Sequence, residues 1–224
     1  MCPVCQSENL AAPMFGQPVY RCNECGHLFR SRQYIDRFEY SFYKDNSYWY
    51  DDPQYYLRQK MWLALFDEWI TRRGSCIEFG AGTGELISQI ADAGWTSRLI
   101  YSEIEDLCQS GIQCERNIGL VEDILPEIQD CSLDHIFMFD VIEHTKKPFE
   151  VLRGIARTLS ASGRAYIITT NGNSKYSDDE MFYHLEHFHI WSKESWSKTL
   201  EQCGLHQEMF YQDGIFLYSV VSAP

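Results

Sequence analysis

The sequence has no long apolar run and few basic residues, and both shortages exclude classes of protein. No apolar stretch reaches 18 residues, so we expect no membrane-spanning helix. The N-terminal residues MCPVCQSENL lack the basic and apolar regions of a secretory signal, which favours a cytoplasmic protein. Only 19 basic residues face 32 acidic ones, for a net charge of −13. Nucleic acid is therefore a disfavoured partner, unless a local basic patch outweighs the overall charge.

The nine cysteines do not indicate a disulfide scaffold, because their number is odd. Two CxxC pairs, Cys2 with Cys5 and Cys22 with Cys25, are separated by sixteen residues. Two such turns bring four sulfurs together, which is the ligand set of a closed, structural zinc site. We expect this zinc to fold residues 1–33 into a small zinc ribbon. The remaining cysteines are expected to be buried apolar filler: Cys76, Cys108, Cys114, Cys131 and Cys203.

A tyrosine-rich linker follows over residues 34–60 and includes the start of a helix. Within it, Tyr43, Tyr48 and Tyr50 either pack against the domain or form a lid over a ligand. From Tyr55 the apolar spacing predicts an amphipathic helix. Its buried face would consist of Leu57, Met61, Leu65, Phe66 and Trp69.

The stretch CIEFGAGTGEL, residues 76–86, holds three glycines between an apolar run and a helix-like segment. This order predicts a strand, a tight turn and a helix, which together open a Rossmann-like sheet. The turn reads GxGxG, whereas a dinucleotide site has GxGxxG, and no GxxxxGK[ST] motif is present to form a P-loop. Glu78 precedes the glycines, where it would repel a pyrophosphate and suit a ligand that carries a cationic amine.

Acidic residues stand at the ends of the later predicted strands. We expect these strands over residues 98–106, 119–125, 133–144 and 163–173. Ligands of such sheets bind at the carboxyl ends of the strands. Glu103 is therefore placed to accept two ribose hydroxyls, and Glu122 and Asp123 are placed to meet an adenine amine.

From about residue 60 to 224 the chain resembles the class I S-adenosylmethionine-dependent methyltransferases. EFGAGTGEL matches the first motif of that family, and FDVIEHTKKP followed by LSASGRAYIITTNGN resembles its small-molecule "DVLEH" branch. The resemblance implies an α/β, Rossmann-like, seven-stranded sheet in the methyltransferase domain, residues 61–224. Its last two strands would form an antiparallel hairpin that turns at Asp213-Gly214. The cofactor-binding residues it implies are Glu78, Gly80, Ala81, Gly82, Gly84, Glu103, Asp123 and Asp140.

S-adenosylmethionine carries a sulfonium, which makes its methyl group electrophilic without help. The protein therefore needs mainly to align the acceptor atom and to exclude water. We expect transfer to a small-molecule acceptor, at oxygen. The order of a four-cysteine knuckle, a tyrosine-rich segment and a methyltransferase core resembles bacterial enzymes of sugar, polysaccharide and natural-product pathways.

The motif DVIEH places Asp140, Glu143 and His144 just after the fourth strand, and a later segment adds His187. Three interpretations stay open: the side chains brace the loop, His144 or His187 acts as a general base, or the four residues hold a second divalent metal. The metal interpretation is similar to the metal-dependent small-RNA terminal 2′-O-methyltransferases, in which a glutamate stands at the position of Asp140. His184 and His189 are as consistent with packing as with activity, and His27 is expected to face solvent.

Two alternative functions follow from the same residues. One is a metal-assisted RNA 2′-O-methyltransferase, whose basic patch would be Arg21, Arg30, Arg32 and Arg37. The other is a module that binds S-adenosylmethionine without catalysis.

Overall fold

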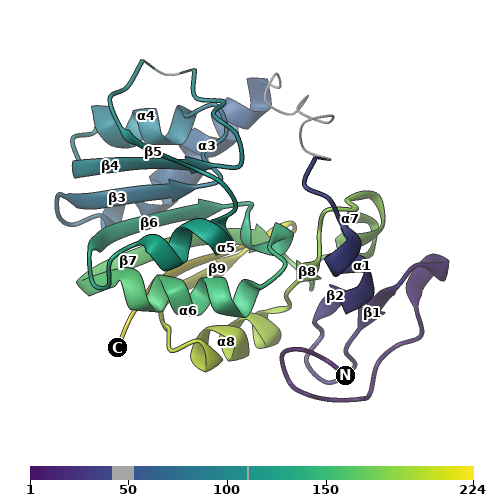
Figure 1. The fold of residues 1–224 in the computed structure, drawn as a ribbon. Coiled ribbons are helices and arrows are strands. Elements are labelled where there is room, and N and C mark those ends of the chain that lie inside the picture. Colours follow the sequence, from purple (N-terminus) through teal and green to yellow (C-terminus); the bar gives the residue numbers. More distant parts are fainter. Residues whose placement is uncertain (42–52, 110) are drawn as a thin grey trace.

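The fold is described here from a computed structural model, which describes residues 1–41, 53–109 and 111–224. Seven strands form its main sheet: β3 (Gly74–Phe79), β4 (Thr96–Glu103), β5 (Glu115–Ile118), β6 (Leu133–Phe139), β7 (Leu159–Thr170), β9 (His206–Gln212) and β10 (Phe216–Ser222). Their order is β5-β4-β3-β6-β7-β10-β9 (Figure 1). The first five are parallel, whereas β10 runs antiparallel to both β7 and β9. The predicted seven-stranded methyltransferase sheet is confirmed.

Helices cover both faces of this sheet (Figure 1). They are α3 (Pro53–Phe66), α4 (Glu85–Asp92), α5 (Val121–Ile124), α6 (Pro148–Thr158) and α8 (Lys193–Gln202), with 3-10 turns at Asp67–Trp69, Leu125–Glu127 and Ile142–His144. Helix α7 (Ser177–Tyr183) lies away from this sheet, beside the N-terminal part of the chain. Successive strand side chains point to opposite faces. Ile77 and Phe79 accordingly pack in the core under α6 and α8, while Cys76 packs in the core under α3 and α4. Among the described residues, no helix has the length and apolar character needed to cross a membrane.

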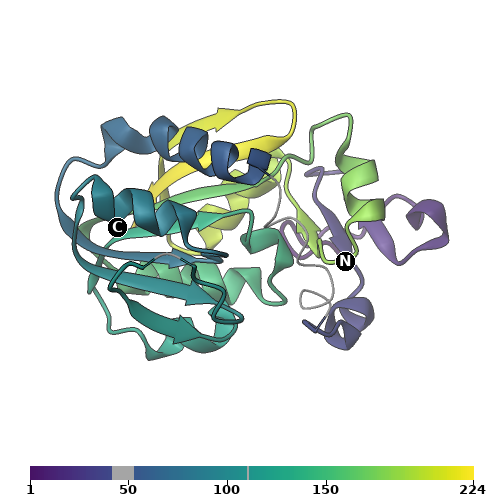
Figure 2. The same ribbon diagram turned by 90° about the horizontal axis from the view of Figure 1, so that it is seen from above.

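A smaller N-terminal part lies beside the main sheet (Figure 2). It contains a 3-10 turn at Met14–Gly16, strands β1 (Val19–Arg21) and β2 (Leu28–Arg30), and helix α1 (Arg32–Arg37). Strand β8 (His189–Ile190), from the methyltransferase part of the chain, pairs antiparallel with β2. The resulting three-stranded sheet, β1-β2-β8, joins the N-terminal part to the main domain. Tyr43, Tyr48 and Tyr50 lie outside the described residues, so their role as packing or lid stays a prediction.

The predicted buried face of α3 is wrong at three positions. Leu57, Met61 and Leu65 are 57%, 69% and 47% exposed. Phe66 is buried as predicted, Trp69 is half-buried, and the buried face otherwise carries Gln59, Trp62 and Leu63. The helix is apolar on both sides, so its periodicity alone does not decide which side meets the sheet.

The strand predicted over residues 119–125 is also wrong. The strand at this point is β5, Glu115–Ile118, and it is followed by helix α5. β5 is an edge strand of the sheet, and among the described strands it pairs with β4 alone. Because an edge strand is poorly buried, its residues lack the apolar pattern that marked the inner strands.

Two smaller expectations also need correction. His27 is fully buried and does not face solvent, because its ring is stacked between Phe29 and His189. Among the scattered cysteines, Cys76 and Cys203 are buried as expected, whereas Cys131 is exposed; Cys108 and Cys114 are half-buried.

Candidate active site

The register of the sheet brings the predicted site residues to one edge. Phe79, at the end of β3, pairs with Ser102 of β4 on one side and with Met138 of β6 on the other. The residues that follow these strand ends therefore lie next to one another. Glu103 and Asp140 stand on either side of the glycine loop that begins after Phe79. This edge is where ligands of open parallel sheets bind.

The glycine loop requires glycine for two separate reasons. Gly80, Gly82 and Gly84 all have positive φ, at 70°, 52° and 92°. A side chain on Gly80 would also collide with Cγ2 of Val141, on the loop after β6. The absence of side chains leaves the main chain of the loop open to close approach by a ligand.

Glu103 is tied to this loop by hydrogen bonds. The Gly82 N–H donates to Glu103 Oε2 at 2.9 Å, and the Ile104 N–H donates to Oε1 at 2.6 Å. Burial raises the pKa of Glu103, while these two N–H groups lower it. The carboxyl group is thus held at the strand end, beside the glycine loop.

Glu78 is a buried acid that lacks a full set of partners. It is 3% exposed, and its Oε2 has no hydrogen-bond partner among the described residues. Burial, together with the nearby Glu103, raises the pKa of Glu78 well above its ordinary value. A buried carboxylate of this kind is costly unless a cation or a proton satisfies it. The site therefore fits a ligand that brings a charged amine to the glycine loop.

The two acids predicted near an adenine are placed differently. Asp123 is exposed in the first turn of α5, and it does not end a strand. Glu122 accepts a hydrogen bond from the Lys146 N–H at 2.8 Å, so it braces the loop that follows the DVIEH motif.

Asp140 and Glu143 belong to the part of the site that follows strand β6. Asp140 has φ of 62°, an uncommon value for a non-glycine residue, and its N–H donates to the Ile168 carbonyl at 3.0 Å. Glu143 is fully buried, and its Oε1 accepts hydrogen bonds from the Thr170 N–H and hydroxyl at 3.1 and 2.9 Å. Burial and the neighbouring Asp140 raise the pKa of Glu143 to about 8.

His144 and His187 meet at this point, as the sequence predicted, and their ring centroids are 4.7 Å apart. His144 Nδ1 lies 3.2 Å from the Glu186 carbonyl oxygen. Because a carbonyl only accepts, Nδ1 carries the proton in this contact and Nε2 is left unprotonated. Burial lowers the pKa of His144, so the ring is neutral near pH 7.

The four residues of the predicted metal set fall into two overlapping groups. Asp140, Glu143 and His144 form one, and His144, Glu186 and His187 form the other; in each, the ligand atoms lie within 4.8 Å of one another. Glu186 was missed by the sequence analysis, although the EH pair that it forms with His187 repeats the EH of DVIEH and marks it.

Arg30, from the N-terminal part, holds the segment that carries these histidines. Its guanidinium is buried and donates to the carbonyls of His187 at 2.9 Å, of His184 at 3.1 Å, and of Met181. His187 Nδ1 is buried without a partner in the described part of the chain. The N-terminal part therefore helps to set the position of the His187 ring.

The four N-terminal cysteines converge as predicted. Their sulfurs lie within 4.8 Å of one another, with Cys2 Sγ 3.7 Å from Cys25 Sγ and Cys5 Sγ 3.4 Å from Cys22 Sγ. Zinc–sulfur bonds near 2.3 Å in a tetrahedron place sulfurs about 3.8 Å apart. Burial raises the pKa of Cys2 to about 11, a cost that a bound cation removes. The donor set and spacing fit zinc.

Comparison with known proteins settles the family. A family model described as a methyltransferase domain matches residues 48–207. The chain belongs to this methyltransferase family. Membership confirms the predicted enzyme class, an S-adenosylmethionine-dependent methyltransferase. No curated protein matches the chain.

Solved structures share the methyltransferase fold at low sequence identity. One is the 1,6-didemethyltoxoflavin-N1-methyltransferase of Burkholderia thailandensis, with bound 1,6-didemethyltoxoflavin and S-adenosylhomocysteine; it has 12% identity and a TM-score of 0.64, over 85% of this chain and 87% of that one. A methyltransferase from Archaeoglobus fulgidus dependent on S-adenosylmethionine has 19% identity and a TM-score of 0.59, over 78% and 79%. A protein from Pyrococcus horikoshii has 15% identity and a TM-score of 0.63, over 77% and 92%. At these identities the likeness shows the fold alone.

Proposed function

We propose that this methyltransferase transfers a methyl group from S-adenosylmethionine to the oxygen of a small-molecule acceptor. The observation that carries the proposal is the unpartnered carboxylate oxygen of Glu78 beside a loop in which three of five residues are glycine. The small-molecule class is supported by the net charge of −13, and by the Burkholderia neighbour, whose named acceptor is a small molecule.

The residues proposed to hold the cofactor line the edge of the sheet. Glu78 would neutralise the amine of the cofactor, and Glu103 would accept the ribose hydroxyls. When bound, the cofactor supplies an electrophilic methyl group. The full proposed set is Glu78, Gly80, Ala81, Gly82, Gly84, Glu103, Asp123 and Asp140, in which Asp123 would act from α5.

His144 is the proposed general base. Its neutral ring leaves Nε2 able to accept the proton that an acceptor hydroxyl loses. Asp140 raises the pKa of His144 and so favours the imidazolium that forms. Glu143 is proposed to hold the loop through Thr170, and His187 to fix the His144 ring by contact.

The test separates chemistry from folding. We expect His144→Ala to lower turnover about 100-fold or more while cofactor affinity, measured by calorimetry, stays unchanged. Radiolabelled S-adenosylmethionine and fractionated small-molecule extract supply the turnover assay. His206→Ala, at an exposed histidine on β9, is the matched control and should leave turnover unchanged. Equal turnover of the two variants would show that His144 takes no part in catalysis.

A second role for the same cluster is a divalent metal site. His144, Glu186 and His187 are the proposed ligands, in place of the four-residue set predicted from the sequence. Such a metal would polarise the acceptor oxygen. This role predicts that dialysis against a chelator lowers turnover and that Mg²⁺ or Mn²⁺ restores it, while the N-terminal zinc stays bound. If the chelator does not change turnover, the cluster holds no catalytic metal and His144 acts as a general base without one.

The N-terminal part is proposed to be a structural zinc ribbon, with Cys2, Cys5, Cys22 and Cys25 as the ligands. We further propose that it spans residues 1–33, that residues 34–60 form the linker, and that residues 61–224 form the catalytic domain.

The alternative functions receive no support from the described residues. The basic stretch proposed for RNA does not offer four free cations, since the Arg30 guanidinium is buried against carbonyl groups and Arg21 is paired with Asp178 at 2.5 Å. Membership of a methyltransferase family likewise does not favour a binding module without catalysis.

A further inference from the structure

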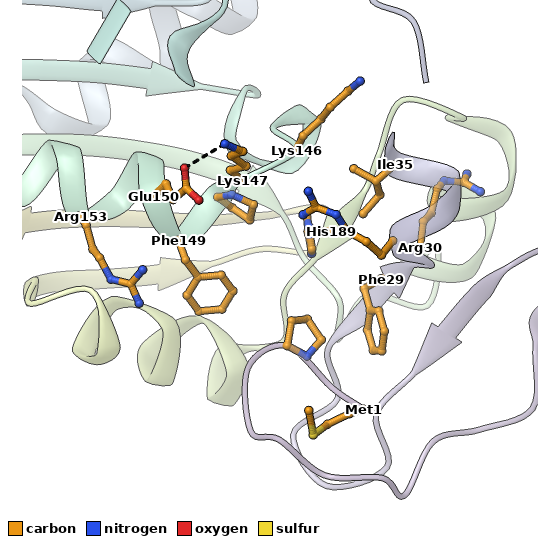
Figure 3. A pocket seen from close by; sticks show the side chains of 13 residues that line it. Met1, Phe29, Arg30, Ile35, Lys146, Lys147, Phe149, Glu150, Arg153 and His189 are labelled. Carbon is orange, nitrogen blue, oxygen red and sulfur yellow. Dashed lines mark ion pairs between the residues drawn. The ribbon is translucent and has the colours of Figure 1, made fainter. Parts of the chain in front are cut away.

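A cavity of about 310 Å³ lies where the N-terminal part meets α6 (Figure 3). The N-terminal part contributes one wall, which includes Phe29 and Ile35. The opposite wall is the segment from Lys146 to Arg153, at the start of α6, and His189 of β8 also lines the cavity. A volume of this size accommodates a small ligand or one end of a larger one.

The charge of this cavity is opposite to that of the whole protein. Five basic residues line it, against a single acid, Glu150, in a chain with a net charge of −13. The basic residues are Arg30, Arg32, Lys146, Lys147 and Arg153. Such a local concentration of positive charge attracts an anion even when the total charge of the protein is negative.

Three of these cations are exposed to an incoming ligand. Arg153 forms no ion pair within the described part of the chain, and it is exposed. Lys147 Nζ lies 3.3 Å from Glu150, and Arg32 Nε lies 2.8 Å from Asp36, in pairs whose side chains are about half exposed or more. Exposed pairs of this kind contribute little to stability, so an anion competes for the cations at small cost.

The start of α6 adds to the positive potential. Residues Lys147, Pro148 and Phe149 line the cavity, and among the described residues the N-cap Lys147 makes no side-chain capping hydrogen bond. The N-terminal end of this 11-residue helix, which carries a partial positive charge, therefore lies at the cavity wall, although Glu122 accepts a hydrogen bond from the neighbouring Lys146 N–H. Phe29 and Phe149 supply apolar surface beside these charges, as Figure 3 shows.

The cavity wall and the candidate active site share a segment of the chain. Lys146 comes two residues after His144, and its Nζ donates to the Phe38 carbonyl at 2.6 Å. The same Nζ lies 5.1 Å from the ring centre of Tyr40, whose hydroxyl donates to the His144 carbonyl at 3.1 Å. One short segment thus contributes both the proposed base and the wall of the cavity.

We propose that this cavity binds the phosphate of a small phosphorylated molecule. That this molecule is the methyl acceptor rests on the proposed function. Phosphate matches the site because lysine, arginine and a helix terminus are its common protein partners. A nucleic acid fits less well, because a polyanion extending beyond the cavity would meet an acidic surface.

The experiment measures binding by the whole protein in the absence of S-adenosylmethionine. Inorganic phosphate and pyrophosphate, titrated separately by calorimetry at low salt, distinguish a monoester-like from a diphosphate-like ligand. We expect saturable binding of one of them and an affinity about tenfold lower in Arg153→Gln, because one charge-assisted contact is lost. The double variant Lys147→Gln with Arg153→Gln should lose more, and both residues are exposed, so the fold is retained.

Lys60→Gln is the matched control, since it removes one exposed positive charge from α3, outside the cavity. It should bind the anion as the wild type does. Equal weakening by Lys60→Gln, or no saturable binding of either anion, would overturn the proposal. Tighter binding of a single-stranded oligonucleotide than of pyrophosphate, with a steep salt dependence, would also overturn it. Binding of S-adenosylmethionine is measured separately, so failure of the anion site leaves the proposed function standing.

Discussion

At the scale of single residues, the site depends on polar groups that the fold buries without full compensation. Glu78 Oε2, Glu143 Oε2 and His187 Nδ1 all lack hydrogen-bond partners among the described residues. Each such group is costly in a protein interior. Their concentration at one edge of the sheet indicates a place organised for ligands more than for stability.

Glu78 gives a prediction about pH. Its raised pKa means that the folded protein keeps a proton that the unfolded chain releases, so this group stabilises the free fold at low pH and loses that effect as pH rises through the raised pKa. An ammonium ligand pairs with the ionised form. We therefore expect the affinity for S-adenosylmethionine to increase as the pH rises above the ordinary carboxyl range toward the raised pKa of Glu78, as long as the ligand amine stays protonated.

Calorimetry at several pH values checks this expectation. Glu78→Gln should bind about tenfold more weakly at pH 7 and should show a weaker pH dependence, because the carboxylate proposed to pair with the ammonium is gone. If Glu78→Gln kept the wild-type pH profile of binding, the ammonium group of the cofactor would not be paired with Glu78.

Arg30 gives a prediction about stability. Arg30→Lys removes the planar fork that satisfies three carbonyls, and a single ammonium cannot reach them all. The free energy of unfolding should fall by about 2–4 kcal/mol, measured by chemical denaturation. Arg32→Lys, at an exposed pair, is the control and should change it by less than about 0.5 kcal/mol. Similar values for both variants would show that the buried contacts contribute little.

At the scale of elements, the cost of adding a side chain to the glycine loop has two parts, backbone strain and steric collision, which can be measured separately. Gly80 and Gly94 have nearly equal φ, at 70° and 71°, but only Gly80 lies against another residue. Gly94→Ala should therefore cost about 1–2 kcal/mol of folding free energy from backbone strain alone. Gly80→Ala should cost clearly more and should weaken cofactor binding, because Val141 must move. Thermal melts with calorimetry compare the two, and equal costs would contradict the collision.

The elements that the sequence predicted correctly are those whose signals are local. The turn chemistry of GAGTG and of Asp213-Gly214, and the apolar runs of β3 and β6, depend only on neighbouring residues. The failures depend on distant partners. Edge strand β5 lacks a buried face, α3 is apolar on two sides, and the burial of His27 depends on His189, 162 positions away.

The candidate site follows the same division. Asp140, Glu143 and His144 were found because they adjoin one strand end. Glu186 was given no role because its position relative to His144 is set by a separate loop; the EH pair marks the residue but does not reveal which strand end it approaches.

At the scale of the whole molecule, the proposed zinc and the methyltransferase domain should be coupled. Cys22→Ser should release the metal, raise the mobility of β1 and β2, and lower turnover, because Arg30 no longer holds the His187 segment. Metal analysis, thermal melts and the labelled-methyl assay measure these effects. Cys131→Ser, at an exposed cysteine outside the cluster, should keep both metal and turnover. A metal-free Cys22→Ser protein with full turnover would show that the two parts work independently.

The strand pair β2–β8 has a consequence for synthesis on the ribosome. Leu28 pairs with Ile190, so β2 leaves the ribosome 162 residues before the strand that completes its sheet. Contacts of such sequence separation form late in folding, because a long loop must close first. The nascent segment that carries β2 is thus exposed to proteases and to competing partners until β8 has been translated, and early metal capture would shorten that vulnerable interval.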